Sequence, residues 1–309
     1  MVARMSSTQN ASERFGLSIP TEWWAARSML EEIGDGGFRW IQLPAPPTSV
    51  LVDPRTCIPH ARAAGAIVSA AGLRSVLHAP AELMAGTHEH DRGIEGAIAY
   101  AAECGAAAVV LHARSLCDGR GAGDRMLAET RALARLAPMA ERVGVTLVLE
   151  NLAPVYPGPE TVSANPLALR ALARRISSPA VGLCLDVGHA NVVAGLRRTS
   201  LSRMVEPVLD MVALFHVHDN LGARWIRDNR PELDPIRLDL HLPPGRGSLP
   251  WDEVGPSLLD HKAPMIWEIH PPRPKPREIM EAAQVCFTTI DSIEFEADRA
   301  QSIASSSAP

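Results

Sequence analysis

The sequence has no long basic run and few aromatic residues. Its 309 residues include 35 acidic and 30 basic side chains, the net charge is −5, and aromatic residues account for only 4%. A nucleic-acid surface needs concentrated positive charge, usually with aromatic side chains among it. We therefore expect no nucleic-acid partner and no non-specific binding to an acidic membrane.

Long apolar runs and paired cysteines are also missing. No apolar run approaches the ~20 residues of a membrane span, and the opening residues MVARMSSTQNASERFG lack the apolar region of a signal peptide. The cysteines form no CxxC motif and are odd in number, as expected for reduced thiols; they are Cys57, Cys104, Cys117, Cys184 and Cys286. These absences favour a cytoplasmic protein that does not contact membranes.

Glycine-rich phosphate loops are absent as well. Neither GxGxxG nor GxxxxGK[ST] follows any apolar run, which makes a nucleotide-binding open sheet less attractive. What the sequence does contain is a recurring pattern of short apolar runs, each of which stops on His, Asp or Glu. These runs are VLHAP, VVLHAR, VTLVLENL, GLCLDVGHAN, LFHVHDN and IWEIHP.

The apolar runs predict eight buried strands with helices between them. We expect strands at 15–19, 38–43, 75–77, 107–111, 145–152, 181–185, 211–215 and 265–267. We expect helices at 21–33, 57–71, 92–103, 124–142, 166–176, 200–210 and 277–290, a proline-rich loop at 43–54 and a long functional loop at 221–252. Such alternation predicts an α/β fold, a single-domain (β/α)₈ TIM barrel over residues 15–292, with flexible segments at 1–14 and 293–309. A doubly wound open sheet is the alternative.

In a TIM barrel, catalytic groups gather at the C-terminal ends of the strands, which is where the polar residues of these runs fall. Imidazole and carboxylate donors without thiolate suit Zn, Mn, Co, Fe or Mg. A single His at a strand end is more often hydrogen-bonded than metal-bound, but a series of them at successive strand ends indicates a metal site. The candidate ligands are His78, His112, Glu150, Asp186, His189, His216, Asp239, His241 and Glu268.

At these residues the sequence resembles the xylose isomerase-like TIM-barrel superfamily. That group includes sugar phosphate isomerases and epimerases, inosose and dehydroshikimate dehydratases, and endonuclease IV. The resemblance covers about residues 15–290 and depends on an ordered set of motifs. They are HAP at His78, LEN at Glu150, GLCLDVGHAN at Asp186–His189, HVHDN at His216–Asp219, DLHLPPGRG at Asp239–Gly247 and WEI at Glu268.

The resemblance implies one divalent ion held by Glu150, Asp186, His216 and Glu268, as in the isomerases and epimerases. It also implies that Glu150 and Glu268 remove and return a proton beside a sugar carbonyl, while His189 hydrogen-bonds the substrate oxygens. Further substrate contacts are expected from Arg246, His218 and His270.

Endonuclease IV supplies the alternative reading, because its residues matching all the candidate positions hold three zinc ions. The first ion would take His78, His112 and Glu150; the second Glu150, Asp186, His216 and Glu268; the third His189, Asp239 and His241. However, Ala81 and Glu82 stand where endonuclease IV carries residues that probe DNA. On the epimerase side, Tyr156 replaces a second Glu, Gln42 replaces a Glu on strand two, and GRG replaces GEG at Gly245–Gly247.

We therefore expect a metal-dependent isomerase or epimerase, or a related dehydratase, that acts on a small sugar, polyol or sugar phosphate. The alternative is an endonuclease IV-like zinc phosphodiesterase with a trinuclear site. A third reading is a barrel without activity that serves as a binding module, against which the intact ligand set argues. Members of this fold often pair, so a homodimer is possible.

Overall fold

The computed structural model describes residues 12–20, 26–113, 121–154, 161–223, 238–271 and 273–287. In this part of the chain, eight parallel strands close into a barrel in sequence order. The strands are β1 (Phe15–Ser18), β2 (Trp40–Pro44), β3 (Arg74–His78), β4 (Ala106–His112), β5 (Thr146–Glu150), β6 (Val181–Asp186), β7 (Val212–Val217) and β8 (Met265–Trp267). The expected barrel is confirmed. Residues 1–11 of the expected N-terminal segment, and the expected tail at 293–309, lie outside the described residues.

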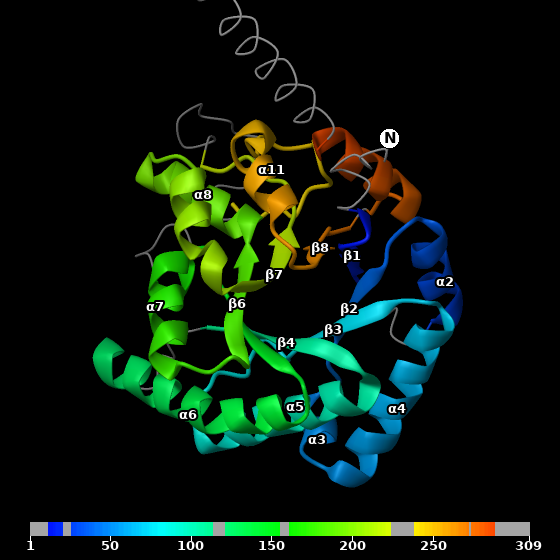
Figure 1. Ribbon diagram of the computed structural model, residues 1–309, viewed down its shortest axis with the longest axis vertical. Coiled ribbons are helices and arrows are strands. Elements are labelled where there is room, and N and C mark those ends of the chain that lie inside the picture. The colour runs from blue at the N-terminus through cyan, green and yellow to red at the C-terminus, as the bar shows by residue number, and fades with distance from the viewer. Residues whose placement is uncertain are drawn as a thin grey trace, which may run out of the picture.

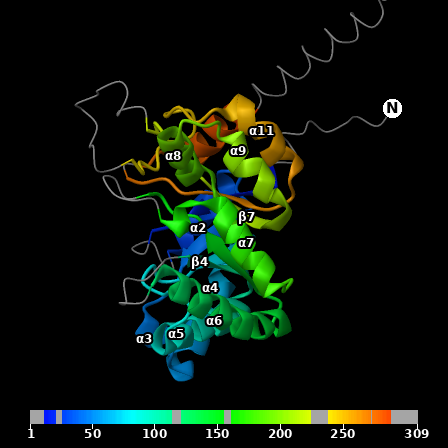
Figure 2. The same cartoon turned by 90° about the vertical axis from the view of Figure 1, so that its left-hand side faces the viewer.

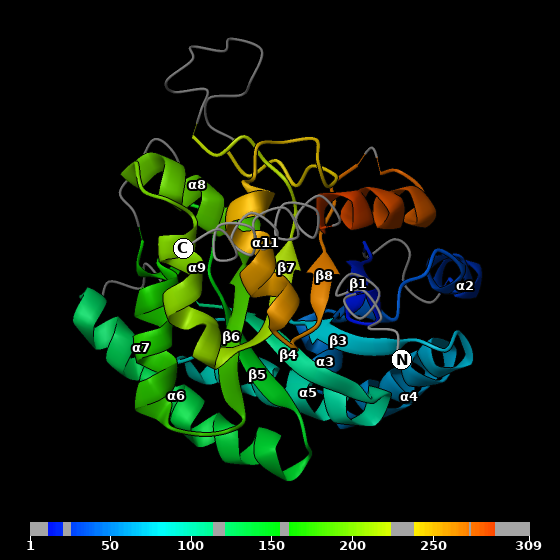
Figure 3. The same ribbon diagram turned by 45° about the horizontal axis from the view of Figure 1, so that its top comes forward.

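Helices surround the strands on all sides (Figure 1). They are α2 (Arg27–Asp35), α3 (Thr48–Leu51), α4 (Pro54–Ala70), α5 (His88–Cys104), α6 (Ala122–Arg142), α7 (Pro166–Ile176), α8 (Val187–Arg197), α9 (Ser202–Val205) and α11 (Trp251–Asp260), with 3₁₀ turns at η2 (Val162–Ala164) and η3 (Glu206–Met211). Residues 276–287 are also helical. The turned views separate α3 to α6 from α8, α9 and α11, which lie on the opposite side of the barrel (Figures 2 and 3). None of the described helices combines the length and apolarity needed to cross a bilayer.

Local sequence explains where several helices begin. Asp53 precedes α4, and its side chain accepts a hydrogen bond from the backbone N–H of Arg55 at 3.1 Å. Asn165 caps α7 in the same way through the N–H of Leu167 at 3.2 Å. In both helices proline is the first residue, where its missing N–H is no loss. Such caps satisfy backbone donors that the first turn leaves unpaired.

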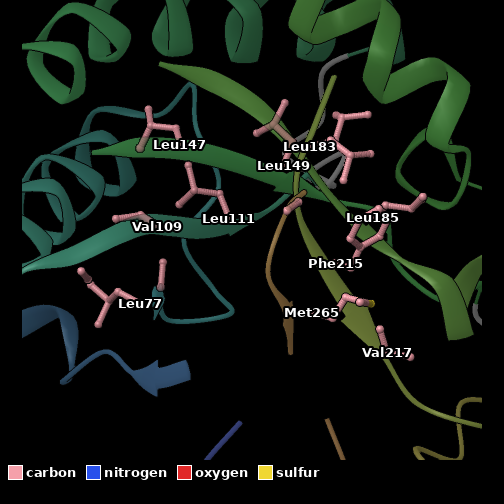
Figure 4. Close-up of a cluster of buried hydrophobic side chains, with 14 of the residues drawn as sticks. Leu77, Val109, Leu111, Leu147, Leu149, Leu183, Leu185, Phe215, Val217 and Met265 are labelled. Atoms are coloured by element: carbon pink, nitrogen blue, oxygen red, sulfur yellow. The ribbon is translucent and has the colours of Figure 1, made fainter. Parts of the chain in front are cut away.

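Both faces of the barrel sheet are buried. Because successive side chains of a strand point to opposite faces, the core has an outer part between strands and helices and an inner part inside the barrel. Outward residues such as Leu77, Val109, Leu147 and Phe215 pack against the helices (Figure 4). Inward residues form a separate cluster inside the barrel: Trp40, Val76, Ala108, Val110, Val148, Cys184, Leu214 and Ile266. The last inward positions of the strands are the polar ones, so this apolar layer is the floor of the site.

Four sequence expectations about helices and loops were wrong. The loop expected at 43–54 contains the short helix α3, which starts after Pro47. The region after β6 holds α8, which was not expected, and the helix expected at 200–210 is divided into α9 and η3. The helix α11 was not expected either, and its first residues are the last two of the loop expected at 221–252. Residues 224–237 of that loop lie outside the described residues.

Candidate metal centre

The site lies at the C-terminal end of the barrel, where strand register brings inward side chains together. His112 pairs with Glu150 across β4 and β5, and Asp186 pairs with His216 across β6 and β7. Glu268 directly follows β8. Each of these residues has the inward parity of its strand, so the polar ends of neighbouring strands face one another.

Donor atoms gather in three adjoining groups, and within each group they lie within 4.8 Å of one another. The groups are His78, His112 and Glu150; Glu150, Asp186, His216 and Glu268; and His189, His218, Asp239 and His241. All the residues predicted as ligands are in these groups, and Glu150 belongs to two of them. The arrangement could hold up to three neighbouring cations, with Glu150 as a bridge.

Glu150 connects the first two groups because its two oxygens face different histidines. Its Oε2 lies 3.3 Å from Nε2 of His78 and 3.3 Å from Nε2 of His112. Its Oε1 lies 3.1 Å from Nδ1 of His216. That same nitrogen of His216 is 3.6 Å from Oε2 of Glu268 and 4.0 Å from Oδ2 of Asp186. Three carboxylates therefore converge on one imidazole nitrogen.

The third group is built by α8 and by the segment that follows residue 237. An isolated antiparallel bridge between Asp219 and Leu242 holds this segment against the end of β7. Nε2 of His241 lies 3.0 Å from Oδ1 of Asp239, and Nε2 of His189 lies 3.3 Å from Oδ2 of Asp239. The backbone of His241 has φ +46°, a left-handed conformation that is uncommon for a residue with a side chain.

Five of the six histidines in these groups, all but His112, are oriented through the nitrogen that does not face the donors. A backbone carbonyl only accepts hydrogen bonds, so a ring nitrogen beside one must carry the proton, and the other nitrogen keeps a lone pair for a metal. The ring nitrogens so fixed are Nδ1 of His78 on Ala79 O at 2.7 Å, Nδ1 of His189 on Asn151 O at 2.7 Å, Nδ1 of His241 on Glu268 O at 3.0 Å, Nδ1 of His218 on Asp219 O at 3.4 Å and Nε2 of His216 on Oε1 of Gln42 at 2.7 Å.

Asn151, the last residue of the LEN motif, sets the positions of two donors. Its amide forms a pair of hydrogen bonds with the backbone of Asp186, donating to the carbonyl and accepting from the N–H, each at 2.9 Å. Its own carbonyl accepts from His189. The motif therefore contributes one donor, Glu150, and fixes two others.

Several buried polar atoms point into the donor groups without a hydrogen bond to the described residues. They include Oε2 of Glu150, Oδ2 of Asp186 and Nε2 of His218. Leaving a buried polar atom unsatisfied is costly, and a divalent cation would satisfy these atoms together. The residues present therefore fit a divalent metal, with nitrogen and oxygen donors that suit zinc, manganese or cobalt.

Without a cation, the carboxylates are balanced by protonated imidazoles. Burial raises the pKa of Glu150, but His216 and hydrogen bonds from the surrounding histidines outweigh it and hold that pKa well below its usual value. Burial lowers the pKa of His216, yet Cys184 together with Glu268 and Glu150 raises it well above normal. Burial also lowers the pKa of His189, and Asp186, Asp239 and Glu150 raise it well above normal. A metal that binds here would replace these protons.

A cavity of about 540 Å³ opens above the donors, a size typical of small-molecule sites. Glu150, Glu268 and His270 line it together with the less polar Leu152 and Ala153. The side chain of Glu268 is 15% exposed and that of Glu150 only 2% exposed. Of the two carboxylates, Glu268 is the one that a ligand reaches more readily.

Of the three residues predicted to contact substrate, only His270 lines the cavity. His270 lines the cavity and stacks on His241 with ring centroids 4.0 Å apart. His218 is fully buried and stacks beneath His241 at 3.8 Å, where it joins the third donor group. Arg246 is exposed and does not line the cavity. Tyr156 lies outside the described residues.

Sequence reasoning missed two contributors to the site. Gln42 reaches across the barrel interior, accepting from His216 at 2.7 Å while its amide N–H donates to Glu268. Asn151 was seen only as part of a motif. The inward parity of Gln42 on β2 was a signal for its position, but its partners lie more than 170 residues away along the chain.

The family model described as xylose isomerase-like TIM barrel matches residues 30–288. A search of curated proteins found no match. A solved D-tagatose 3-epimerase-like protein is 21% identical with a TM-score of 0.69, over 90% of this chain and 98% of that one. A D-psicose 3-epimerase solved in the presence of D-fructose is 11% identical with a TM-score of 0.61, over 91% and 97%. A Thermus thermophilus protein soaked with zinc chloride is 21% identical with a TM-score of 0.60, over 88% and 97%. At such identities the likeness to these solved structures establishes the fold alone.

Proposed function

The chain belongs to the xylose isomerase-like TIM barrel family, and from this premise we propose that it is a divalent-metal-dependent isomerase or epimerase of a small sugar, polyol or sugar phosphate. The observation that supports this most is the second donor group. Glu150, Asp186 and Glu268 surround Nδ1 of His216 within 4.0 Å. The solved epimerases that share the fold carry names of sugars, which supports the same substrate class.

The proposed reaction transfers a proton at a carbon beside a carbonyl group. A divalent ion in the second group would supply Lewis-acid stabilisation for the negative charge that develops as the proton leaves. Glu268 faces the cavity, and because the imidazole of His216 outweighs the effect of burial, its pKa is lowered and it is ionised at neutral pH. Glu268 therefore accepts the proton and, once protonated, can return it to the neighbouring carbon in an isomerisation. An epimerisation needs a proton on the other face of the carbon, which Glu150 can deliver only after it has taken up a proton itself, because its pKa is held low.

The other groups have supporting roles in this proposal. Nδ1 of His189 is committed to Asn151, so His189 can reach a substrate oxygen only through Nε2, which faces Oδ2 of Asp239 at 3.3 Å. His270 lines the same cavity and is close enough to the donors to contact a hydroxyl-rich ligand.

The test is solvent isotope exchange into ketoses, inososes and their phosphates in D₂O, with the metal content measured on the same preparation. We expect exchange with the wild type and a loss of about 10²–10⁴-fold for Glu268→Gln, which keeps the shape of the side chain but removes the base. His78→Ala is the matched variant, because His78 lies in the first group only and should matter far less in a one-metal enzyme. Equal losses from both variants would count against the proposal.

A second candidate is a trinuclear phosphodiesterase, favoured by the completeness of the first and third donor groups. Three zinc ions per chain, with cleavage of abasic-site DNA or of small phosphodiesters, would support it. The exposed Glu82 beside the HAP motif and the net charge of −5 count against a DNA substrate. One ion per chain together with proton exchange would leave the isomerase proposal standing alone.

A further inference from the structure

A second hollow, of about 410 Å³, lies at the opposite, N-terminal end of the barrel. Four basic side chains line it, Arg14, Arg39, Arg74 and Lys262, with one acidic side chain, Glu13. The indole of Trp40, the lowest layer of the inner core, also lines it. The hollow therefore gathers a local excess of positive charge in a chain whose net charge is −5.

The backbone fixes these cations along one arc of the barrel. Arg14 precedes β1, Arg39 precedes β2, Arg74 begins β3 and Lys262 precedes β8, and these four strands are neighbours in the closed sheet. Backbone hydrogen bonds extend the sheet through them: the N–H of Arg74 donates to Arg39 O at 2.9 Å, and that of Met265 donates to Arg14 O at 2.8 Å. The four strands of the other half begin with uncharged residues, Ala106, Thr146, Val181 and Val212.

The four cations differ in what already holds them. Arg14 donates to the carbonyls of Leu258, Leu259 and Ala263 at 3.0–3.3 Å, so its charge is fixed at the rim. Arg39 makes a loose ion pair with Glu13 at 3.6 Å. Arg74 and Lys262 have no acidic partner among the described residues. Glu13 therefore balances only one of the four positive charges around the hollow.

Arg74 is presented in the way that suits an anion. Its guanidinium carbon stacks 3.9 Å above the ring of Trp40, an arrangement that covers the faces of the guanidinium and leaves its N–H edges available. A planar guanidinium edge donates two parallel hydrogen bonds to phosphate oxygens, and a lysine ammonium adds a point charge beside them.

We propose that this hollow is a binding site for a small phosphate-bearing anion, separate from the metal centre. Its size lies in the range of small-molecule pockets, so the ligand is a phosphorylated metabolite rather than a polymer. The site is formed before binding, because the rim backbone and Arg14 are held by hydrogen bonds whether or not an anion is present. A phosphate there would balance the cations that Glu13 leaves unpaired.

The test is isothermal titration of inorganic pyrophosphate into metal-free protein, since pyrophosphate also chelates metal ions. The variants are Arg74→Gln and Lys262→Gln, and the matched control is Arg131→Gln, which removes an exposed cation from α6. We expect saturable binding by the wild type that weakens with added salt, with affinity reduced at least about tenfold in each hollow variant and unchanged in the control.

Trp40 is buried, so thermal unfolding of both variants checks that loss of binding is not loss of the fold. Glu150→Gln, at the other end of the barrel, should bind pyrophosphate as the wild type does. No saturable binding by the wild type would overturn the proposal, as would equal affinity in wild type and both hollow variants. A changed affinity in Glu150→Gln alone, with both hollow variants equal to the wild type, would place the anion at the metal centre and would also overturn the proposal.

Discussion

Gln42 illustrates how much a single residue can decide in this site. An ionised carboxylate only accepts hydrogen bonds, so the amide N–H of Gln42 must face Glu268, and its oxygen must then face His216. That oxygen accepts from Nε2 of His216, which leaves Nδ1 of the ring directed at the carboxylates. One uncharged side chain thus sets both the tautomer of a donor and the position of the proposed base.

We predict that Gln42→Leu weakens metal binding about 10–100-fold, as is common when a partner behind a ligating histidine is lost. Affinity would be measured by competition with a chelating dye at constant pH. Gln42→Glu is the matched comparison, because it keeps an acceptor for His216 but loses the donor to Glu268. It should retain most of the affinity, because His216 keeps its acceptor; unchanged affinity in the leucine variant would show that Gln42 does not orient His216.

The positions of the candidate donors follow from local sequence, whereas the contacts of Gln42 do not. His112, Glu150 and Asp186 each end an apolar run, and strand parity alone turns them to the inside. The partners of Gln42 come from β7 and from the end of β8, 174 and 226 residues along the chain. Only closure of the barrel brings them together, and no local pattern encodes that contact.

Among the helices, α8 shows where local reading fails. Its sequence, VGHANVVAGLR, contains two glycines and adjacent β-branched valines, which are poor helix formers. The helix depends on tertiary contacts instead: Asn220 donates to the carbonyl of Gly188 at 2.8 Å and accepts from Asn191 at 2.8 Å. A Cβ atom at position 188 would lie less than 3 Å from the ring of His218. Packing therefore requires glycine at this position.

Asp186 begins this helix and also serves the metal centre. Its Oδ1 accepts from the backbone N–H of His189 at 2.7 Å, which makes it the N-cap of α8. Its Oδ2 makes no hydrogen bond to the described residues and points into the second donor group. The cap therefore holds the carboxylate in the orientation that leaves one oxygen for a cation.

We predict that Asp186→Asn and Asp186→Ala separate these two roles. Asparagine caps helices as well as aspartate, so the Asn variant should keep the cap of α8 in metal-free protein, yet bind metal more weakly than the wild type. The Ala variant should lose metal binding and, in addition, about 1 kcal/mol of stability from the missing cap. Equal stability of the two variants in urea without metal would show that the cap contributes nothing to α8.

At the scale of the whole molecule, the order of elements was predictable and the connections between them were not. The apolar runs marked all eight strands, and their alternation with helices is enough to predict a closed parallel barrel. The segment carrying Asp239 and His241 has no apolar period, and its place over β7 comes from the bridge between Asp219 and Leu242. The sequence motifs pointed to Asp239 and His241, but backbone pairing is what positions them.

The stability of the barrel should depend on pH through Glu129, on the inner side of α6. This carboxyl is buried beside α7, and burial raises its pKa to about 7 although the nearby Arg125 lowers it. Between the unfolded value of 4.5 and about 7, the folded state keeps a proton that the unfolded state has released. Stability therefore falls as pH rises through this window, by up to about 3 kcal/mol for this one group.

Glu129→Gln removes this titration while keeping a similar shape. Compared by urea unfolding of metal-free protein, it should match the wild type at about pH 4.5 and exceed it by about 1–3 kcal/mol at about pH 8. Glu141→Gln, which neutralises an exposed carboxylate on the same helix, is the control and should change little at either pH. The metal-centre groups titrate equally in all three proteins, so the difference between variants isolates Glu129. A variant that is no more stable than the wild type at the higher pH would mean that the barrel accommodates the charged carboxylate without cost.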